Sequence, residues 1–480
     1  MQASFVFDTV ARKPQIVSEF LSVIREHFSV EDKALTFMRR RTGRMNMPVR
    51  KYAITNKGYF DLPFMQTICT ELLSNFPNLK IIISKELEEK ITTNKISELP
   101  VNLNFTPRDY QLESATKALN NGMGIIVLPT SAGKTLTIAL IASTALEKNN
   151  FNVLILVPNI QLVEQTYNDF IEYGISSTKM SRWTGNYEYQ SAPIVIANNQ
   201  ILLSKTQDVS VLNNFDVLIV DEVHKIGTAE KISKLVKNIK GKYKFGFTGS
   251  MPSNKFDSWS INKIFGPIIY QKDSIELRNN NFITNVKVIG LEMEYKNIPE
   301  FQRPSMDNPT AGYLEEIEWL HTQEFRNSII AKIINGLDTN TLVLVDRIVH
   351  GEFLHKYLSE CTNKKVYFIQ GSVNVEERES LRSLMEETSG VVCIAISKIF
   401  STGISIKNLH NVVFASIGKS RIKIIQSIGR SLRLHHTKKL ATIFDIADTC
   451  LNYGYKHFEE RKALYQSENI PLSVKKLVEK

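Results

Sequence analysis

The sequence lacks the patterns that mark several classes of protein. Its four cysteines lie far apart and form no CxxC pair, which argues against a zinc ribbon or a disulfide framework. The apolar stretches, such as residues 153–157, are much shorter than the roughly 20 residues of a membrane-spanning helix. The first residues include an acid, Asp8, and no long apolar run, so they do not look like a signal peptide. We therefore expect a soluble, intracellular protein without structural zinc.

Length and charge bound the class further. The chain has 480 residues, 43% of them hydrophobic and 22% charged, which is the profile of a globular protein. This length predicts about three domains. The 59 lysines and arginines outnumber the 49 acids and give a net charge of +10. An anionic partner is therefore expected, and nucleic acid is the first candidate.

Short apolar runs alternate with helical patterns beyond residue 100. Continuous β-branched runs are typical of strands buried on both faces, and helices between them indicate parallel βαβ units. We expect strands at residues 124–128, 153–157, 194–197, 217–220, 244–247, 341–345, 366–369, 391–396, 411–415 and 442–445. The predicted fold class is α/β: a small α+β domain (1–100), two parallel-sheet lobes (101–278 and 279–450) and a helical extension (451–480).

A candidate phosphate-binding loop follows the first of these strands. It reads Pro129-Thr130-Ser131-Ala132-Gly133-Lys134-Thr135 and leads into a helical run. A helix N-terminus offers free N–H donors to phosphate. Gly133 permits close approach of the backbone, Lys134 can reach the β- and γ-phosphates of ATP, and Thr135 can ligate Mg²⁺. The strict pattern has glycine where this chain has Leu128, and the alternative is an ordinary helix start with a nearby lysine.

Two acids, Asp221 and Glu222, directly follow the expected strand at 217–220. Acids at the end of a buried strand are costly without a partner, and a metal-bound nucleotide supplies one. Asp221 is predicted to bind Mg²⁺ through water, and Glu222 to orient and deprotonate the attacking water. His224 is predicted to couple the state of the γ-phosphate to the neighbouring lobe. The alternative is a solvated pair of acids in a loop.

A candidate adenine site precedes the phosphate loop by some twenty residues. Gln111 can hydrogen-bond N6 and N7 of adenine, and the ring of Phe105 can stack on the base. Arg108 lies between them and is included in the predicted nucleotide site. The alternative is a helix start with proline in its first turn.

A basic helix is expected near the end of the second lobe. Its residues Gln426, Gly429, Arg430 and Arg433 have the spacing of a single helix face. Arg430 and Arg433 are predicted to stabilise the charge of the transition state when ATP is hydrolysed, as fingers supplied by the second lobe. The alternative is a solvated basic face or a contact to a nucleic-acid backbone.

Together these motifs resemble those of superfamily-2 helicases and translocases, which have two RecA-like lobes. They occur in the order of that family, at residues 107–111 (PRDYQ), 129–135 (PTSAGKT), 221–224 (DEVH), 248–250 (TGS), 401–405 (STGIS) and 426–433 (QSIGRSLR). The resemblance implies that Thr248 and Ser250 couple nucleotide state to movement. It also implies that Gly403 and Gln426 contact ATP.

The closer resemblance is to the tailed-phage recombination helicases of the UvsW type, through residues 128–135 (LPTSAGKT), 400–405 (FSTGIS) and 426–433. It implies an ATP- and Mg²⁺-dependent DNA helicase that migrates Holliday junctions and remodels forks in phage recombination, repair or replication. It also implies the host cytoplasm, and we expect a monomer. The alternatives are a helicase for RNA or RNA–DNA hybrids, and a DNA-binding or annealing protein with weak ATPase activity.

Nucleic-acid contacts are expected in all three domains. The resemblance places a strand across both lobes, with candidate contacts at Asn159, Thr184, Arg347, Gly371 and Thr402, each of which has an alternative as a turn or cap residue. The N-terminal domain contains a basic run, residues 38–51, in which Arg39, Arg40, Arg41 and Arg44 occur without an acid. We predict a turn-like segment that binds duplex or junction DNA. A solvated loop is the alternative.

Overall fold

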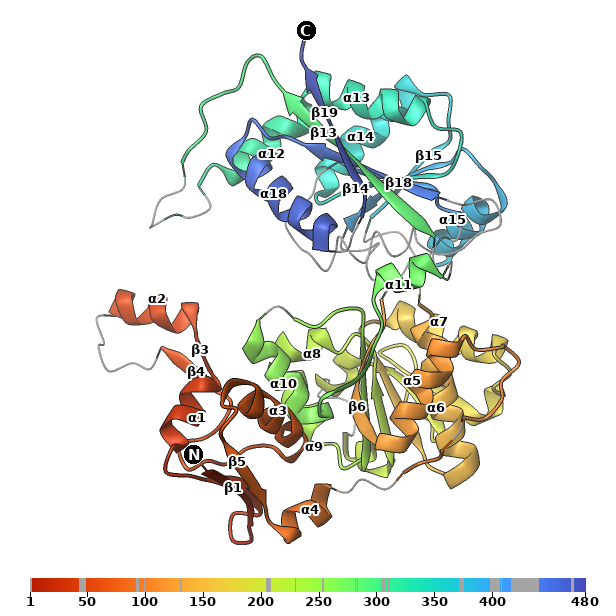
Figure 1. Ribbon diagram of the computed structural model, residues 1–480. Coiled ribbons are helices and arrows are strands. Elements are labelled where there is room, and N and C mark those ends of the chain that lie inside the picture. The colour runs from red at the N-terminus through yellow and green to blue at the C-terminus, as the bar shows by residue number, and fades with distance from the viewer. Residues whose placement is uncertain are drawn as a thin grey trace. The chain divides into compact units, whose positions relative to one another are not determined.

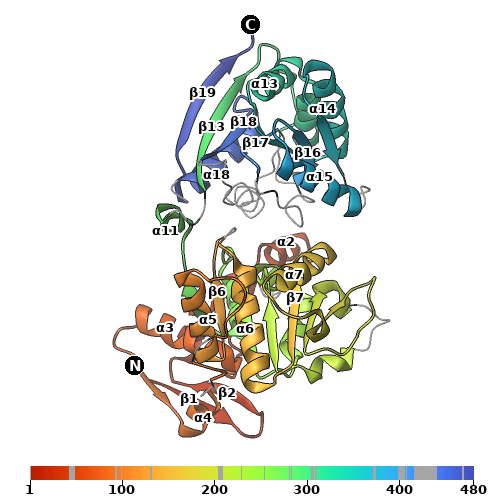
Figure 2. The same ribbon diagram turned by 90° about the vertical axis from the view of Figure 1, so that its right-hand side faces the viewer.

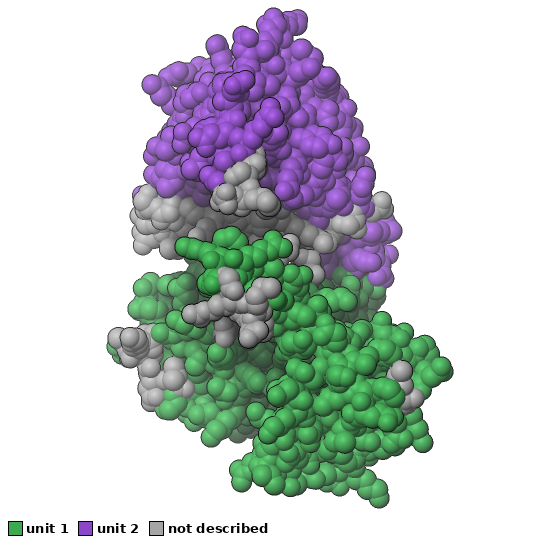
Figure 3. All heavy atoms as spheres, turned by 90° about the vertical axis from the view of Figure 1, so that its left-hand side faces the viewer, with its two compact units in different colours: residues 1–128, 133–272 green, residues 129–132, 273–480 purple. Residues whose placement is uncertain are grey.

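A computed structural model describes residues 2–42, 49–91, 95–98, 100–129, 132–203, 209–228, 230–252, 254–280, 282, 284–303, 308, 311–370, 375–397, 406, 408–415, 440–467 and 470–480. The chain divides into two compact units (Figure 3). The first comprises residues 1–128 and 133–272, and the second comprises residues 273–480 with 129–132. None of the helices in the described ranges is long and apolar enough to cross a membrane.

The first 91 residues of the first unit form a small α+β domain. Its strands are β1 (Gln2–Asp8), β2 (Lys13–Val17), β3 (Ser29–Glu31), β4 (Arg50–Tyr52) and β5 (Lys80–Ile83). Its helices are α1 (Leu21–His27), α2 (Lys33–Thr42), the 3₁₀ turn η1 (Leu62–Phe64), α3 (Met65–Asn75) and α4 (Lys85–Ile91). β1 lies between β2 and β5 in one sheet, and β3 pairs with β4. Alternate side chains of β1, Ala3 and Phe5, are buried in the core of this domain, as expected for a strand with one covered face.

The rest of the first unit is a lobe with a seven-stranded parallel sheet (Figure 1), in the order β12-β6-β11-β10-β7-β9-β8. The strands are β6 (Met123–Val127), β7 (Val153–Val157), β8 (Met180–Trp183), β9 (Ile194–Asn198), β10 (Val217–Val220), β11 (Tyr243–Thr248) and β12 (Ile268–Gln271). The helices are α5 (Asp109–Asn121), α6 (Lys134–Asn149), α7 (Ile160–Glu172), η2 (Ser177–Lys179), η3 (Asn199–Leu203), η4 (Val209–Asn214), α8 (His224–Thr228), α9 (Glu230–Asn238) and α10 (Lys255–Phe265). All residues of β7 and β10 are buried, which is why the sequence shows them as unbroken apolar runs.

The second unit contains another seven-stranded parallel sheet, in the order β15-β16-β14-β17-β18-β13-β19. The strands are β13 (Asn285–Glu294), β14 (Thr341–Val345), β15 (Val366–Ile369), β16 (Val392–Ile396), β17 (Asn411–Phe414), β18 (Leu440–Ala447) and β19 (Leu472–Val478). The helices are α11 (Ser274–Asn279), α12 (Tyr313–Thr322), α13 (Glu324–Asn335), α14 (Ile348–Cys361), α15 (Val375–Glu387) and α18 (Asn452–Ser467). The predicted fold class, two parallel-sheet α/β lobes after a small α+β domain, is confirmed.

The N-terminal domain packs against the first lobe through α10. Trp259 of α10 is buried among the core residues of the N-terminal domain, where its ring lies 5.4 Å from that of Phe28 and 6.4 Å from that of Phe64. Its indole N–H donates to Oε1 of Glu71 at 2.9 Å. The domain predicted at residues 1–100 is therefore not a separate body, because it shares a core with the lobe that follows it.

Two expectations about local structure are corrected. The basic run is not a turn throughout, because Arg39, Arg40 and Arg41 occupy the last turn of α2 and the run ends in β4. The C-terminal extension is helical only in α18. After it, residues 472–478 form β19, which pairs in parallel with β13 at the edge of the second sheet (Figure 2). The whole charged tail was expected to be helical, but an edge strand also tolerates exposed charges.

Candidate nucleotide site

The predicted phosphate loop and acidic pair meet at the carboxyl ends of the strands in the first lobe's sheet. β11 lies between β6 and β10, and all three strands are parallel. The loop before α6 follows β6, the acids follow β10, and Thr248 ends β11. The carboxyl ends of adjacent parallel strands form the usual crevice for a ligand in an open α/β sheet. The structure therefore brings these three motifs together at the carboxyl ends of neighbouring strands.

The phosphate loop ends in a backbone conformation that favours glycine. Gly133 has a φ of +76° and is the residue before the first turn of α6. The next residue, Lys134, donates from Nζ to the carbonyl oxygen of Leu128 at 3.3 Å, so its ammonium group lies back across the loop. A phosphate placed at the N-terminus of α6 would meet this ammonium group and the free N–H groups of the first turn.

The acidic pair is half-buried, and its carboxylates interact with each other and with nearby cations. Burial raises the pKa of Asp221 to about 6, and the neighbouring charge of Glu222 adds to the shift. Burial also acts to raise the pKa of Glu222, but Lys134, His224 and Lys225 outweigh it and lower that pKa. Glu222 has a φ of +52°, and its N–H donates to Oδ1 of Asp221 at 2.8 Å. The pair thus keeps an ionised carboxylate, Glu222, beside the phosphate loop.

Residues predicted to couple nucleotide state to movement form a connected chain. Nδ1 of His224 lies 3.2 Å from Oε2 of Glu222 and 3.0 Å from Oγ1 of Thr248. The Thr248 hydroxyl donates to the carbonyl oxygen of Ser250 at 2.8 Å. A change in the position of Glu222 can therefore reach the segment after β11 through two side chains.

The predicted adenine residues lie at the start of α5. Oε1 of Gln111 accepts from the backbone N–H of Arg108 at 2.9 Å, and its Nε2 donates to the carbonyl oxygen of Gly133 at 3.3 Å. Gln111 is buried, so it links α5 to the phosphate loop as well as lying near a nucleotide site. The Arg108 guanidinium donates to the hydroxyl of Tyr110. Phe105 is 43% exposed, and the centre of its ring lies 5.3 Å from that of Tyr173.

Several predicted site residues fall outside the described residues. They are Thr130 and Ser131 of the phosphate loop, Gly403, Gln426, Arg430 and Arg433 of the predicted nucleotide contacts, and Arg44, Gly371 and Thr402 of the predicted nucleic-acid contacts. Their roles stay predictions. Pro129 and Ala132 are described, as loop residues between β6 and α6.

The described nucleic-acid candidates of the lobes occupy caps and a turn. Oδ1 of Asn159 accepts from the N–H of Leu162 at 2.9 Å and caps α7. Thr184 is buried, and its hydroxyl accepts from the N–H groups of Asn186 and Tyr187. These are the turn and cap roles that the sequence left open. Arg347 is the N-cap residue of α14 and is half-buried.

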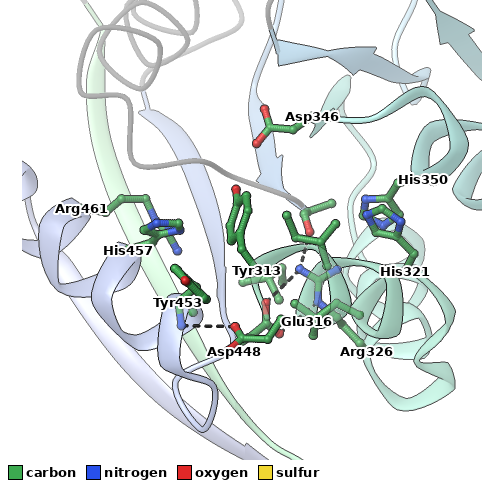
Figure 4. Close-up of a pocket in the computed structure, with 15 residues that line it drawn as sticks. Tyr313, Glu316, His321, Arg326, Asp346, His350, Asp448, Tyr453, His457 and Arg461 are labelled. Carbon is green, nitrogen blue, oxygen red and sulfur yellow. Dashed lines mark hydrogen bonds and ion pairs between the residues drawn. The ribbon is translucent and has the colours of Figure 1, made fainter. Parts of the chain in front are cut away.

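A second group of buried polar residues, around a pocket within the second unit (Figure 4), was not predicted from any pattern in the sequence. Nε of Arg326 lies 3.0 Å from Oδ1 of Asp448, and this oxygen also accepts from the hydroxyl of Tyr295 at 2.6 Å. A second nitrogen of the guanidinium donates to the carbonyl oxygen of Ala415. These contacts tie β13, α13 and the end of β17 together, so we assign them a structural role.

The residues at the carboxyl ends of β6 and β10 fit a magnesium-bound nucleoside triphosphate. The left-handed backbone of Gly133 permits close approach of phosphate, and the ammonium group of Lys134 lies across the loop. Two half-buried carboxylates, Asp221 and Glu222, follow β10, which is separated from β6 by β11. Carboxylate and hydroxyl oxygens are the ligands that Mg²⁺ prefers, and Asp221 and Thr135 supply them here. Lys134 matches the charge of the phosphates.

Comparison with known proteins agrees with this geometry. Residues 104–253 match the family model described as the res subunit of type III restriction enzymes, and residues 326–435 match the helicase conserved C-terminal domain. The chain is 31% identical over 412 residues to the ATP-dependent DNA helicase uvsW of Enterobacteria phage T4, with 80% of each protein covered. The chain belongs to the UvsW family of DNA helicases. The family resemblance predicted from the motifs is thereby confirmed, as are the RecA-like lobes.

Two further relatives extend the comparison. The putative helicase 22 of a Sulfolobus islandicus filamentous virus is 24% identical, and the match covers 72% of this chain and 64% of that protein. A putative HsdR subunit of a type I restriction enzyme from Vibrio vulnificus YJ016 has a solved fragment with a TM-score of 0.57 at 17% identity, covering 86% of this chain and 74% of the fragment. This second likeness concerns the fold alone.

Proposed function

We propose that the chain is an ATP-dependent DNA helicase or translocase that acts on branched DNA, with Holliday junctions and forks as its substrates in recombination, repair or replication. The observation that carries this proposal is the meeting of Lys134, Asp221 and Glu222 at the carboxyl ends of β6 and β10, which flank β11, in a member of the UvsW family. ATP with Mg²⁺ is the proposed cofactor.

The described residues divide the work of hydrolysis among them. Lys134 would neutralise charge on the β- and γ-phosphates, and Asp221 and Thr135 would hold the metal. Bound Mg²⁺ would offset the phosphate charge. Glu222, ionised because Lys134 and His224 lower its pKa, would accept a proton from the attacking water. Arg430 and Arg433 are proposed to stabilise the transition-state charge, and Gly403 and Gln426 to contact the nucleotide.

Coupling to DNA would run from Glu222 through His224 and Thr248 to Ser250. The contacts at 3.2 Å and 3.0 Å on one imidazole nitrogen support this role, because that nitrogen cannot donate to both oxygens at full strength. Loss of the γ-phosphate and its water would change what Glu222 accepts, and His224 would then favour Thr248.

The proposed DNA contacts combine both lobes with the N-terminal domain. Arg39, Arg40 and Arg41, in the last turn of α2, carry no resolved ion pair within the described residues and are proposed to bind phosphates of a duplex arm. Arg44, Asn159, Thr184, Arg347, Gly371 and Thr402 are the further proposed contacts, with Thr184 limited to its backbone because its side chain is buried.

Unwinding assays test this function. The substrates are Holliday junctions, forks, tailed duplexes, RNA–DNA hybrids and duplex RNA, and the wild-type chain is compared with Lys134→Ala and Glu222→Gln. We expect ATP-dependent unwinding of branched DNA, and a loss of kcat of about 10²-fold or more in Glu222→Gln with ATP binding retained. Hydrolysis stimulated by RNA and not by branched DNA would assign an RNA helicase instead. An absence of DNA-stimulated hydrolysis in wild type would leave a binding or annealing protein.

Oligomeric state is the remaining part of the proposal. We propose that the chain works as a monomer, and light scattering of the chain bound to a Holliday junction measures this directly. A complex with one chain per junction agrees with the proposal, and a dimer or higher species contradicts it.

A further inference from the structure

A cavity lined by lysines lies in the first unit, at the amino-terminal ends of the strands, whereas the nucleotide site lies at their carboxyl-terminal ends. Its volume is about 260 Å³, and its charged lining residues are Asp61, Lys237, Lys242, Lys244 and Lys263. Lys244 pairs with Met123 where β11 and β6 begin, whereas the phosphate loop follows the end of β6. A strand of five residues spans roughly 16 Å, so the γ-phosphate site and this cavity are separate.

The charges around this cavity are not balanced. Four lysines and one carboxylate line it, and Lys237 Nζ forms an ion pair with Oδ1 of Asp61 at 2.6 Å. Lys244 donates to the carbonyl oxygen of Lys237 at 3.1 Å, which brings two ammonium-bearing side chains together. Like charges at close range repel each other, and burial makes the repulsion stronger.

The pKa values of two lining lysines, Lys244 and Lys263, are lowered in this arrangement. Burial lowers the pKa of Lys244 to about 8, and the nearby charge of Lys237 contributes. Burial also lowers the pKa of Lys263, with Asp61 opposing the shift. A bound anion would favour the charged form of both lysines and offset the repulsion.

The cavity lies beside the basic run of the N-terminal domain. Nζ of Lys263 is 5.4 Å from the centre of the Phe256 ring, and Nζ of Lys51 is 5.8 Å from the centre of the same ring. Lys51, in β4, is the last residue of that run and also forms an ion pair with Asp32 at 2.6 Å. Positive charge therefore continues from the N-terminal domain across Phe256 to the cavity.

We propose that this lysine cavity is a phosphate-binding site that holds a backbone phosphate of a DNA arm, apart from the strand path proposed over the two lobes. The proposal rests on the proposed function in that it takes DNA as the substrate. Lysine binds phosphate as a point charge without reading the bases, so the contact would fix the position of an arm and not its sequence. Free pyrophosphate has the same chemistry and is the other source of a phosphate group.

The test replaces the two half-buried lysines, Lys244 and Lys263, with methionine, which nearly keeps the length of the side chain and removes the charge. Binding of a fluorescent forked duplex by Lys244→Met/Lys263→Met is measured by anisotropy over a range of KCl concentrations. We expect affinity to fall on the order of tenfold, and the slope of log K against log[salt] to decrease by about one. ATP hydrolysis without DNA is expected to match wild type.

A matched control removes the same charge elsewhere. Lys148 and Lys179 are exposed and do not line the cavity, so Lys148→Met/Lys179→Met should bind the fork more nearly as wild type does. If Lys244→Met/Lys263→Met failed to fold, Lys242→Gln changes an exposed lining residue and should weaken binding in the same direction by a smaller factor.

Two results would overturn the proposal. In the first, Lys244→Met/Lys263→Met has the same fork affinity and the same salt slope as the control. This result would show that the cavity holds no DNA phosphate. If, in addition, pyrophosphate raised the Tm of wild type and not of that variant, the cavity would belong to a free anion. Both results leave the helicase function intact, which fails only if wild type shows no DNA-dependent hydrolysis or unwinding.

Discussion

At the scale of single residues, Gly133 sets the geometry of the phosphate loop. Its φ is +76°, and an added Cβ would collide with the side-chain amide nitrogen of Gln111. We expect Gly133→Ala to displace the loop and lower kcat for ATP hydrolysis by about 10²-fold, because catalytic groups misplaced by about 1 Å have effects of that size. Steady-state ATPase assays measure the change.

Two variants control this prediction. A Cβ at Gly185 would meet no atom within 4 Å, so Gly185→Ala should hydrolyse ATP at the wild-type rate. Gly133→Ala/Gln111→Ala removes the colliding amide but leaves the left-handed backbone, so it should recover no more than part of the activity. Wild-type kcat in Gly133→Ala would show that the loop tolerates a side chain.

Two buried histidines of the second unit are expected to make the folded protein less stable in acid. The rings of His321 and His350 stack with centres 4.2 Å apart (Figure 4). Burial, with Arg326 and Arg347 nearby, lowers the pKa of His321 to about 4, and burial, Arg326 and His321 lower that of His350. Between about pH 6.5 and pH 4, these two histidines bind more protons in the unfolded chain than in the folded chain. The free energy of unfolding should therefore decrease as pH falls through this range, by up to about 1.4 kcal/mol per pH unit for each histidine.

Thermal unfolding between pH 4.5 and 7.5 measures this dependence. His321→Gln/His350→Gln should show a smaller fall of Tm on acidification than wild type. His355→Gln, on the same helix as His350, serves as the matched control because His355 lies outside the stacked pair, with its Nε2 3.2 Å from the accepting carbonyl oxygen of Val366. If the Tm of the double variant fell with pH as much as that of wild type, the histidine pair would not be the cause of the acid sensitivity.

At the scale of elements, the strand at the C-terminal end of the sequence protects an edge of the second sheet. β19 pairs with β13 from Val288 to Glu294, and Lys476 forms an ion pair with Glu294 at 2.8 Å. Deleting residues 472–480 would expose the N–H and C=O groups of β13. We expect a lower Tm for the second unit and more aggregation, because an unpaired strand edge is a template for pairing with another chain. Calorimetry and light scattering measure both effects. Equal Tm and scattering in the truncated chain would contradict the prediction, and Lys475→Gln, exposed on β19, is the control.

The sequence predicted the central strands well and the peripheral ones poorly. β7, β10 and β14 begin and end where expected, because strands buried on both faces need unbroken apolar runs, and the edge strand β15 also has its expected bounds. β8, β12, β13 and β19 were missed, since β13 alternates buried and exposed residues and β19 is mostly exposed. The nucleotide residues could be predicted because each lies in a short motif next to a strand. The lysine cavity and the Arg326 cluster could not, because their members come together only through tertiary packing.

At the scale of the whole molecule, the N-terminal domain and the first lobe share apolar and polar contacts around α10. Trp259 contributes its ring to the core of the N-terminal domain, Asn262 donates to Oγ1 of Thr67 at 3.0 Å, and Lys237 pairs with Asp61. α10 follows the segment at 248–250, and it also packs against α8, which begins at His224. The helix that anchors the N-terminal domain therefore contacts an element of the nucleotide site.

Removing the ring of Trp259 should make the N-terminal domain and the first lobe unfold in separate transitions. Trp259→Ala leaves a cavity in a shared core, and we expect it to cost about 3–5 kcal/mol. Calorimetry should then show the N-terminal domain melting below the first lobe, and limited trypsin digestion should release an N-terminal fragment that wild type retains. Trp259→Phe keeps most of the apolar contact and loses only the hydrogen bond to Glu71, so its loss should be much smaller. If Trp259→Ala still melted with the first lobe in one transition, the remaining contacts of α10 would suffice to hold the domain, and the aromatic contact would not be its anchor.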